Sequence, residues 1–362
     1  MKIAFDYTAF LLQRYGGVTK YFVELVKKIS INHNSKIIAP ISINNYINEL
    51  NNEIFCLTKL NKVPRFGTKI SHKLNFIISS IYMKHWKPDI IHKTFFNNHS
   101  YKSQTAKKIL NVWDLNHEIY PELYNKNKDW RPKKKALEMV DHVICSSYKT
   151  QNDLAKFYNF DLKKTSVVYQ GVSQFENNQN IRYKKKKYLL YVGSRLKYKN
   201  FDNLLRALSI NKQILQDYQL ICFGEEKANS YEKELIKNLD LNEKNIFFIS
   251  GNNNMLQEYY LNSTALIYPS KNEGFGFPPI EAMSFGCPVI TSNNSAILEA
   301  TNLSEYSFNP ELPEDILIKI QNVIYSKSNI DFLINYGLKR IKKLSWEGTS
   351  NNILEVYKKI LN

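Results

Sequence analysis

The chain has 362 residues, of which 43% are apolar, and it carries 50 basic against 33 acidic side chains. This composition excludes a disordered polar chain and supplies enough apolar residues for two domain cores. The net charge of +17 is concentrated in residues 1–180, where 27 basic residues stand against 14 acidic ones. That excess favours an anionic partner for the first half, with a general lysine and asparagine bias as the alternative.

Apolar runs of four to six residues alternate with helical patterns along the chain. Strands are expected over residues 2–6, 36–39, 89–92, 109–112, 142–145, 166–169, 188–192, 219–223, 245–249, 265–268 and 288–291. Helices are expected over residues 18–29, 136–140, 202–209, 231–239, 279–285 and 351–361. Short apolar strands separated by helices predict parallel sheets covered on both faces, an α/β fold. The series occurs twice, which predicts two doubly wound domains, over 1–172 and 188–345, joined by a polar linker at 173–187. The lysines at its end, 184–187, are interpreted as a solvated face rather than a nucleic-acid site.

Three features bear on compartment and membrane contact. Four separated cysteines without zinc-ligand spacing predict free thiols in a reducing compartment. The first residues resemble a strand rather than a secretion signal, so we expect a cytoplasmic protein. Residues 73–84 place apolar side chains at helical spacing with lysines nearby, at Leu74, Ile77, Ile78, Ile81 and Tyr82. We expect a core-facing helix there, with peripheral contact to an anionic membrane as the alternative.

The most informative stretch is residues 269–283, PSKNEGFGFPPIEAM, which directly follows an expected strand. Glu273 falls on a glycine-rich loop, and Glu281 falls eight residues later in the next helix. Backbone N–H groups at such a loop and helix start favour an anion. The two carboxylates can then accept hydrogen bonds from different hydroxyls of a sugar nucleotide. The alternatives are an ordinary loop with an exposed glutamate and a dinucleotide fingerprint, and Pro279 at the third glycine position excludes the second.

Two further glycine positions precede basic or helical segments. Gly193 ends the expected strand 188–192, and Arg195 and Lys199 follow it within reach of a diphosphate. Their charge would stabilise a departing nucleotide. Gly16 and Gly17 stand before the expected helix 18–29, where close backbone approach and the helix dipole favour a phosphate.

Residues 273–282, EGFGFPPIEA, resemble the E-G-F-G-x-P-x-x-E-A signature of glycosyltransferase family 4. The resemblance implies a GT-B fold, with an N-terminal acceptor domain, a C-terminal donor domain and a final helix, 346–362, that crosses back to the first domain. It implies that Glu273 contacts the donor sugar and Glu281 the ribose. It also implies that backbone N–H groups of Gly274, Phe275 and Gly276 lie near the donor.

The same resemblance extends to the other motifs. Lys199 aligns with the family's lysine, whereas Ser194 occupies the place of its arginine after Gly193, and Arg195 comes one residue later. Gly16 and Gly17 match a glycine pair at the donor diphosphate.

Residues 111–118, NVWDLNHE, stand where relatives read T-V-H-D-x-x-x-E. Asp114 matches and is expected to orient the site, whereas Trp113 replaces the histidine. His117 either fills part of that histidine's role or is a surface residue.

The predicted function is therefore a retaining transfer of a sugar from a nucleotide-sugar donor to a glycan or lipid-linked glycan in lipopolysaccharide or other surface polysaccharide synthesis. No Asp-x-Asp motif occurs, so we expect neither a metal nor another cofactor. A GDP-mannose type donor is favoured over a UDP-sugar, and no nucleic-acid module is recognised. The rivals are a non-catalytic sugar-nucleotide-binding partner subunit and a nucleotide-sugar epimerase of the same fold.

Overall fold

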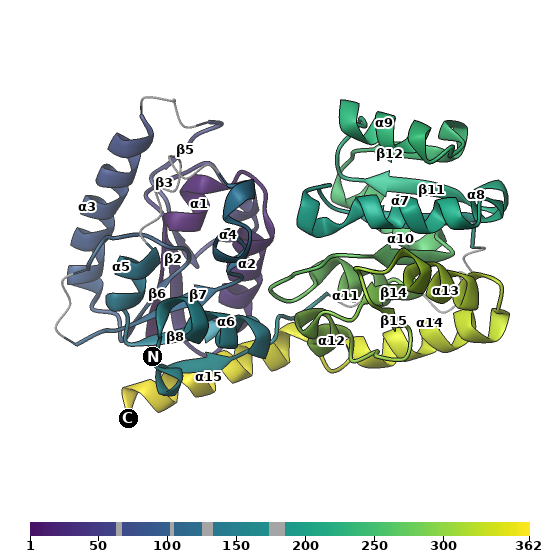
Figure 1. The fold of residues 1–362 in the computed structure, drawn as a ribbon. Helices are drawn as coiled ribbons and strands as arrows, with labels where there is room; N and C mark the ends of the chain where they lie inside the picture. Colours follow the sequence, from purple (N-terminus) through teal and green to yellow (C-terminus); the bar gives the residue numbers. More distant parts are fainter. Residues whose placement is uncertain (63–66, 102–104, 125–132, 174–184) are drawn as a thin grey trace. The chain divides into compact units, whose positions relative to one another are not determined.

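The computed structural model describes residues 1–62, 67–101, 105–124, 133–173 and 185–362, and most of the expected linker lies outside these ranges. The described chain divides into two compact units. The first contains Met1–Leu115, Tyr124–Gly171 and Trp346–Asn362, and the second contains Asn116–Leu123 and Val172–Ser345 (Figure 1).

The first unit is built on a seven-stranded parallel sheet with the order β4-β2-β1-β6-β7-β8-β9. Its strands are β1 (Lys2–Asp6), β2 (Asn34–Ile38), β4 (Ile54–Phe55), β6 (Ile90–Lys93), β7 (Lys107–Val112), β8 (His142–Cys145) and β9 (Thr165–Val167). A separate pair consists of β3 (Ile41–Ser42) and β5 (Thr58–Lys59). The helices are α1 (Thr8–Leu12), α2 (Gly17–Ile29), α3 (Thr68–Trp86), α5 (Lys133–Glu138), α6 (Tyr148–Tyr158) and α15 (Trp346–Leu361).

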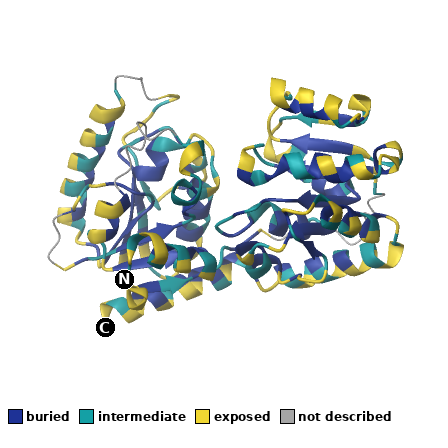
Figure 2. Cartoon of the chain, viewed as in Figure 1, coloured by how far each residue is buried: buried dark blue, intermediate teal, exposed yellow. Residues whose placement is uncertain are grey.

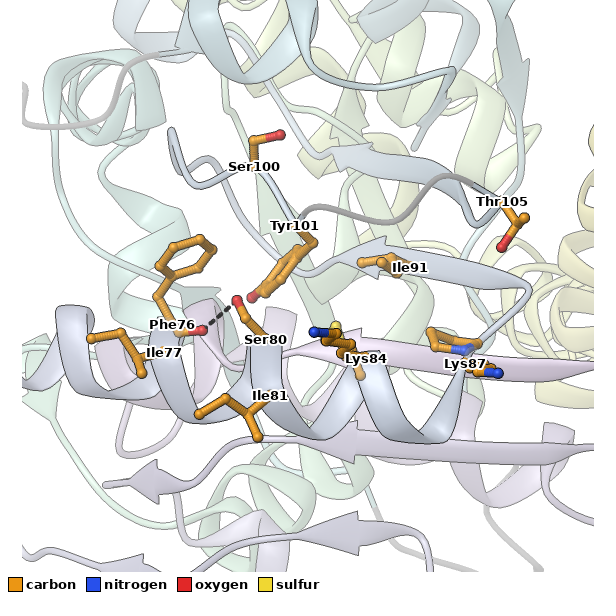
Figure 3. Close-up of a pocket in the computed structure, with 12 residues that line it drawn as sticks. Phe76, Ile77, Ser80, Ile81, Lys84, Lys87, Ile91, Ser100, Tyr101 and Thr105 are labelled. Atoms are coloured by element: carbon orange, nitrogen blue, oxygen red, sulfur yellow. Dashed lines mark hydrogen bonds between the residues drawn. The ribbon is translucent and has the colours of Figure 1, made fainter.

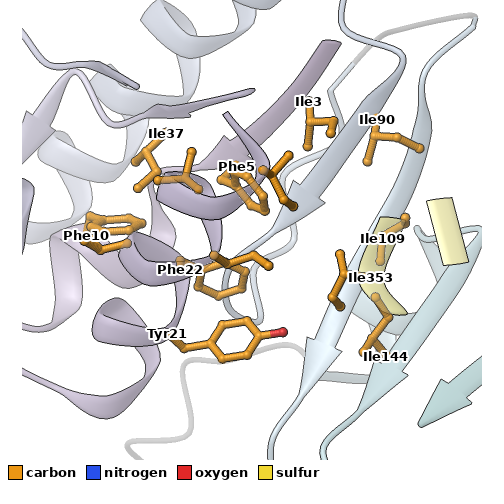
Figure 4. Close-up of a cluster of buried hydrophobic side chains, with 14 of the residues drawn as sticks. Ile3, Phe5, Phe10, Tyr21, Phe22, Ile37, Ile90, Ile109, Ile144 and Ile353 are labelled. Carbon is orange, nitrogen blue, oxygen red and sulfur yellow. The ribbon is translucent and has the colours of Figure 1, made fainter. Parts of the chain in front are cut away.

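One large apolar cluster joins the ends of the chain in this unit. It packs Ile3 and Phe5 of β1 against Phe22 of α2 and Ile353 of α15 (Figure 4). Helix α2 buries seven side chains at helical spacing, and two lysines in its last turn also favour the helix by their charge near its C-terminus. The final helix is therefore part of the first unit's core, although it follows the whole second unit in sequence.

The second unit is built on a six-stranded parallel sheet with the order β12-β11-β10-β13-β14-β15. Its strands are β10 (Tyr188–Val192), β11 (Gln219–Phe223), β12 (Ile246–Ile249), β13 (Ala265–Tyr268), β14 (Val289–Ser292) and β15 (Ser307–Phe308). The longer helices are α7 (Phe201–Ile210), α9 (Ser230–Asn238), α10 (Asn253–Asn262), α11 (Phe277–Ser284), α13 (Pro313–Ile324) and α14 (Lys327–Ile341). The shorter ones are α4 (Asn116–Ile119), α8 (Gln213–Asp217) and α12 (Ser295–Thr301). The prediction of two parallel α/β sheets is confirmed.

The lysine run was expected to be solvated, and Lys186 and Lys187 are exposed, whereas Lys184 lies outside the described residues. Lys185 departs from this expectation, because it is half-buried and its Nζ donates to the carbonyl oxygens of Leu261 and Gly286, at 3.0 Å each. Burial accordingly lowers the pKa of its ammonium. The second correction concerns α3, whose row of aliphatic side chains faces solvent instead of the core (Figure 2). Among the helices that the structure describes, none combines the length and apolarity needed to cross a bilayer.

Candidate functional site

In the second unit, the loops that follow β10 and β13 lie against each other. The backbone N–H of Lys271 donates to the carbonyl of Tyr198 at 2.7 Å, and Ser270 Oγ donates to the same oxygen at 3.3 Å. Both strands are parallel, so their carboxyl ends meet at one edge of the sheet, where ligands of such folds gather. The two strongest sequence motifs are thus brought together.

Glu273 and Lys199 form an ion pair at this edge. Lys199 Nζ lies 2.6 Å from Glu273 Oε1, and the two side chains are 15% and 12% exposed. Tyr268, the last residue of β13, donates its hydroxyl to the same carboxylate oxygen at 2.6 Å. Burial first, and the Glu273 charge second, raise the pKa of Tyr268, which keeps its proton on the phenol. Sequence reasoning missed Tyr268, although its place at the end of a strand marked it as a candidate.

Three glycines at this edge have backbone conformations with positive φ. Gly193 has φ of +128°, and a Cβ added to it would meet no atom within 4 Å. Gly224, after β11, has φ of +153°, and its Cβ would lie 2.5 Å from the Gly193 carbonyl oxygen. Gly276 has φ of +92° and stands directly before α11. All three conformations favour glycine, and the space beside Gly193 is large enough for a ligand to approach the backbone.

The remaining donor-site candidates have different surroundings. Phe275 buries its ring, so only its backbone remains for a ligand, and Glu281 is half-buried on α11. Ser194 is half-buried, and its carbonyl accepts from the Tyr191 hydroxyl at 2.8 Å. Gly274 is half-buried in the loop beside Glu273.

The Arg195 side chain is buried and forms an ion pair and hydrogen bonds within the second unit. Its side chain is 1% exposed, and its Nε lies 2.7 Å from Glu232 Oε1, whose side chain is 3% exposed. Two further nitrogens donate to the carbonyls of Glu225 and Lys227, at 3.3 and 2.6 Å. The guanidinium also lies over the Phe248 ring, 4.8 Å from its centre. The structure thus assigns Arg195 to holding the loop after β11, while Lys199 is the cation beside Glu273.

The segment 116–123 carries the candidate His117 and belongs to the second unit by its contacts. Asn272 Nδ2 donates to Asn116 Oδ1 at 2.6 Å, and both residues are buried. Tyr120 stacks on Tyr198 with ring centres 5.5 Å apart. His117 is half-buried on α4, and Asp114, in the first unit, is also half-buried.

In the first unit, the glycine pair stands at the start of α2. Gly16 precedes the helix in an extended conformation, and a Cβ on it would meet the Gln13 side chain at 2.2 Å. A Cβ on Gly17 would meet nothing within 4 Å. The first turn of α2 therefore has open space beside its backbone, as a phosphate contact requires.

Trp113 occupies the place of the family's histidine and packs on aromatic rings. Its ring meets that of Tyr21 edge-on at 4.7 Å and that of Phe22 at 5.9 Å. Its indole N–H has no hydrogen-bond partner among the described residues. Trp113 thus extends the apolar cluster of the first unit and offers no proton-accepting group.

His92 is a packed core histidine. It is fully buried, with Nε2 2.6 Å from Asn111 Oδ1 and Nδ1 2.6 Å from the Tyr357 hydroxyl. An amide oxygen only accepts, so Nε2 carries the proton and Nδ1 accepts from Tyr357. Burial lowers the pKa of His92 to about 3, and it stays neutral.

A buried carboxylate at the end of β1 was not foreseen from the sequence. Asp6 accepts hydrogen bonds from the backbone and hydroxyl of Thr94, at 2.8 and 2.7 Å, and from the Thr8 hydroxyl at 2.8 Å. Asn97 Nδ2 donates to it at 2.8 Å. Beside it, burial lowers the pKa of the Lys93 ammonium to about 8. This network fixes the loops after β1 and β6, and its signal in the sequence was a carboxylate ending a buried strand.

Comparison with known families agrees with this arrangement. A family model described as Glycosyltransferase Family 4 matches residues 15–174, and one described as Glycosyl transferases group 1 matches residues 172–340. Together they cover residues 15–340, which leaves β1, α1 and α15 of the first unit outside the match. The chain belongs to glycosyltransferase family 4.

Relatives of this family 4 chain include a protein named for the O-antigen chain and an uncharacterized glycosyltransferase. The O-antigen chain mannosyltransferase RfbU of Salmonella typhimurium is 31% identical over 63% of this chain and 64% of its own length. An uncharacterized glycosyltransferase of Methanocaldococcus jannaschii is 24% identical over 60% of this chain and 59% of its own length. Both matches span less than two thirds of the relative.

Solved structures share the fold. A glycosyltransferase from Rickettsia africae has a TM-score of 0.74 at 21% identity, over 100% of this chain and 98% of its own. The glycosyltransferase WaaG, described as involved in lipopolysaccharide biosynthesis, has a TM-score of 0.66 at 14% identity, over 98% of this chain and 99% of its own. These similarities confirm the predicted GT-B fold of two Rossmann-like domains.

Proposed function

We propose that this family 4 glycosyltransferase moves a sugar from a nucleotide-sugar donor to a glycan or lipid-linked glycan, with retention of configuration and without a metal or other cofactor. The observation that carries the proposal is the Glu273–Lys199–Tyr268 group at the carboxyl edge of the second sheet. A carboxylate and a cation in contact at this edge support a site for a sugar and its diphosphate.

Each residue then has a chemical role. Glu273 accepts a hydrogen bond from a donor-sugar hydroxyl, and Tyr268 and Lys199 hold its carboxylate in place. Lys199 Nζ, 2.6 Å from that carboxylate, supplies positive charge to the departing diphosphate, which a metal supplies in other transferases. Glu281 binds the ribose, and the backbone N–H groups of residues 274–276 bind donor oxygens.

Retention follows when the acceptor hydroxyl attacks on the face that the diphosphate leaves. A phosphate oxygen then takes the acceptor's proton, so the protein needs no base at that point. This route is compatible with Trp113, which has no proton-accepting nitrogen.

The proposed donor and acceptor rest on the names of the relatives, and the proposed location rests on the net charge of residues 1–180. RfbU and the E. coli O-antigen chain mannosyltransferase B are both named mannosyltransferases, which favours a GDP-mannose type donor. The same names favour an acceptor that belongs to a surface polysaccharide. The basic excess of residues 1–180 favours a cytoplasmic location with contact to the inner face of an anionic membrane.

The test is nucleotide release from GDP-mannose, UDP-glucose and UDP-galactose by the purified full chain in EDTA. We expect release from one donor, a loss of at least about 100-fold in Glu273→Gln, and no change in Glu314→Gln, an exposed glutamate of the same unit. The anomeric proton of a transferred sugar, read by NMR, decides between retention and inversion. Release that stops in EDTA and returns with Mn²⁺ would contradict the metal-free site.

The packing of Trp113 on Tyr21 supports one alternative, a non-catalytic sugar-nucleotide-binding partner subunit. That alternative predicts nucleotide binding without release from any donor.

A further inference from the structure

Helix α3 carries its aliphatic side chains on the side away from the protein. Ile70, Leu74, Ile77 and Ile81 follow one another at intervals of four, three and four residues and are 62%, 44%, 43% and 56% exposed. This spacing places all four on one face of the helix. Large aliphatic side chains in such a row normally face a core, so their exposure requires an explanation.

The buried face of α3 explains why the aliphatic row points outward. It consists of Ser71, Asn75, Ser79 and Met83. Asn75 accepts from the backbone N–H of Ile41 at 2.8 Å and donates to the Ile41 carbonyl at 3.1 Å. The Tyr7 hydroxyl donates to the carbonyl of His72 at 3.1 Å. The fully buried positions of α3 are thus mainly small and polar, and the half-buried rings of Phe76, Tyr82 and Trp86 pack on a neighbouring core cluster. The aliphatic row takes no part in this packing and is left for another partner.

The charge of α3 has one sign. The helix contains Lys69, Lys73 and Lys84, Lys87 follows it directly, and no acidic residue occurs from Thr68 to Trp86. All four lysines are exposed. On a helical wheel Lys73 and Lys84 lie beside the aliphatic row. Their long side chains can bend so that both ammonium groups stay in water while the aliphatic side chains between them enter an apolar phase.

Two apolar hollows border the row near the end of the helix. One, of about 710 Å³, is lined by Ile77, Ile81 and Lys84 of α3 and by Ile91 of β6 (Figure 3). The other, of about 470 Å³, is lined by Ile81, Tyr82 and Trp86 together with Phe55. Tyr82 and Trp86 are half-exposed there. The apolar surface is thus wider than the row, and amphipathic aromatic rings stand at its edge.

We propose that α3 is the surface by which the first unit docks on an anionic lipid bilayer, lying in the interface with its aliphatic row inserted. The combination of exposed aliphatic residues, flanking lysines and half-exposed Tyr and Trp is that of an interfacial helix. A protein partner fits less well, because lysine is depleted in protein–protein interfaces. The inference rests on α3 alone and does not depend on the transfer reaction.

The experiment is co-sedimentation of the full chain with phosphatidylcholine vesicles, with and without phosphatidylglycerol, at two salt concentrations. We expect binding that needs phosphatidylglycerol and weakens with salt. The triple variant Ile70→Ser, Ile77→Ser, Ile81→Ser should lose binding by about 100-fold or more, since three large aliphatic side chains are no longer available for burial in the bilayer.

A second triple variant, Lys69→Gln, Lys73→Gln, Lys84→Gln, should weaken binding about fivefold per lysine. The matched controls Ile318→Ser and Lys212→Gln, at exposed positions of the second unit, should bind as the parent does. Circular dichroism melting shows whether each variant is folded.

Three results would overturn the proposal. The first is equal binding to vesicles with and without phosphatidylglycerol. The second is binding that neither triple variant reduces. The third is a concentration-dependent dimer that the serine variant abolishes while vesicle binding persists, which would make a second copy the occupant of α3.

Discussion

Removing the Arg195 guanidinium separates its two possible roles. The sequence placed Arg195 at the donor diphosphate, whereas the structure pairs it with Glu232 inside the second unit. In Arg195→Gln the Glu232 carboxylate stays buried without its cation, and the carbonyls of Glu225 and Lys227 lose their donors. Breaking a buried pair from one side costs about 3–5 kcal/mol. We expect a loss of stability of that size, with donor binding nearly unchanged in the molecules that remain folded.

A double variant makes the prediction sharper. Arg195→Met with Glu232→Met replaces both charges by apolar side chains of similar length, which removes the unpaired carboxylate. Glu232 also caps α9, since its Oε2 accepts from the backbone N–H of Asn229 at 2.8 Å. The double variant should therefore recover most of the lost stability but remain about 1 kcal/mol below the parent.

The assay is urea denaturation followed by circular dichroism and intrinsic fluorescence, with calorimetric titration of the nucleotide under native conditions. Arg206→Gln, at an exposed position of α7, is the control and should change neither quantity. The reasoning is refuted if Arg195→Gln retains the parent's stability and loses nucleotide affinity instead.

Four other substitutions test separate parts of the account. The pKa of His92 is about 3 in the folded state and near 6.5 in the unfolded state, so protonation of His92 favours unfolding. The contribution of neutral His92 to stability is therefore complete above pH 6.5 and is lost as the pH falls towards 3. Between pH 7 and 5 the parent should lose about 2 kcal/mol more than His92→Phe in urea denaturation, and parallel profiles would contradict this assignment. Gly224→Ala places a Cβ 2.5 Å from the Gly193 carbonyl oxygen and should lower the free energy of unfolding by about 1–3 kcal/mol. Gly17→Ala places its Cβ where no atom lies within 4 Å, so this variant should keep the parent's melting temperature and weaken nucleotide binding. Lys199→Gln should lower kcat/KM by about 100-fold or more with a small change in melting temperature, and a variant that turns over normally would remove Lys199 from the mechanism.

The buried strands of the two sheets could be predicted from the sequence. The expected strands at 2–6, 142–145, 188–192, 219–223 and 265–268 coincide with β1, β8, β10, β11 and β13. Each is a continuous apolar run flanked by polar residues, because a central strand of a parallel sheet is covered on both faces. Two-residue strands such as β3 and β15 were not predicted, since a pair of residues has no periodicity to detect.

The candidate site was predictable in its members but not in their contacts. The motifs placed Lys199 and Glu273 on two loops, and the parallel register of β10 and β13 brings these loops together. The Tyr268 hydroxyl donates to the Glu273 carboxylate, and Arg195 pairs with Glu232. Both contacts depend on side-chain directions, which the spacing of residues in the sequence does not specify. The orientation of helix α3 could not be predicted either, because an amphipathic pattern is the same whether the apolar face packs on the core or faces solvent.

The central claim is that a nucleotide donor binds at the carboxyl edge of the second sheet without a metal. Hydrogen–deuterium exchange of the full chain in EDTA, with and without saturating GDP or UDP, tests it most directly. The account predicts protection by one nucleotide in the backbone of residues 193–200 and 270–281, and loss of that protection in Glu281→Ala. Absence of protection in both segments at millimolar nucleotide, or protection only when a divalent cation is added, would contradict it.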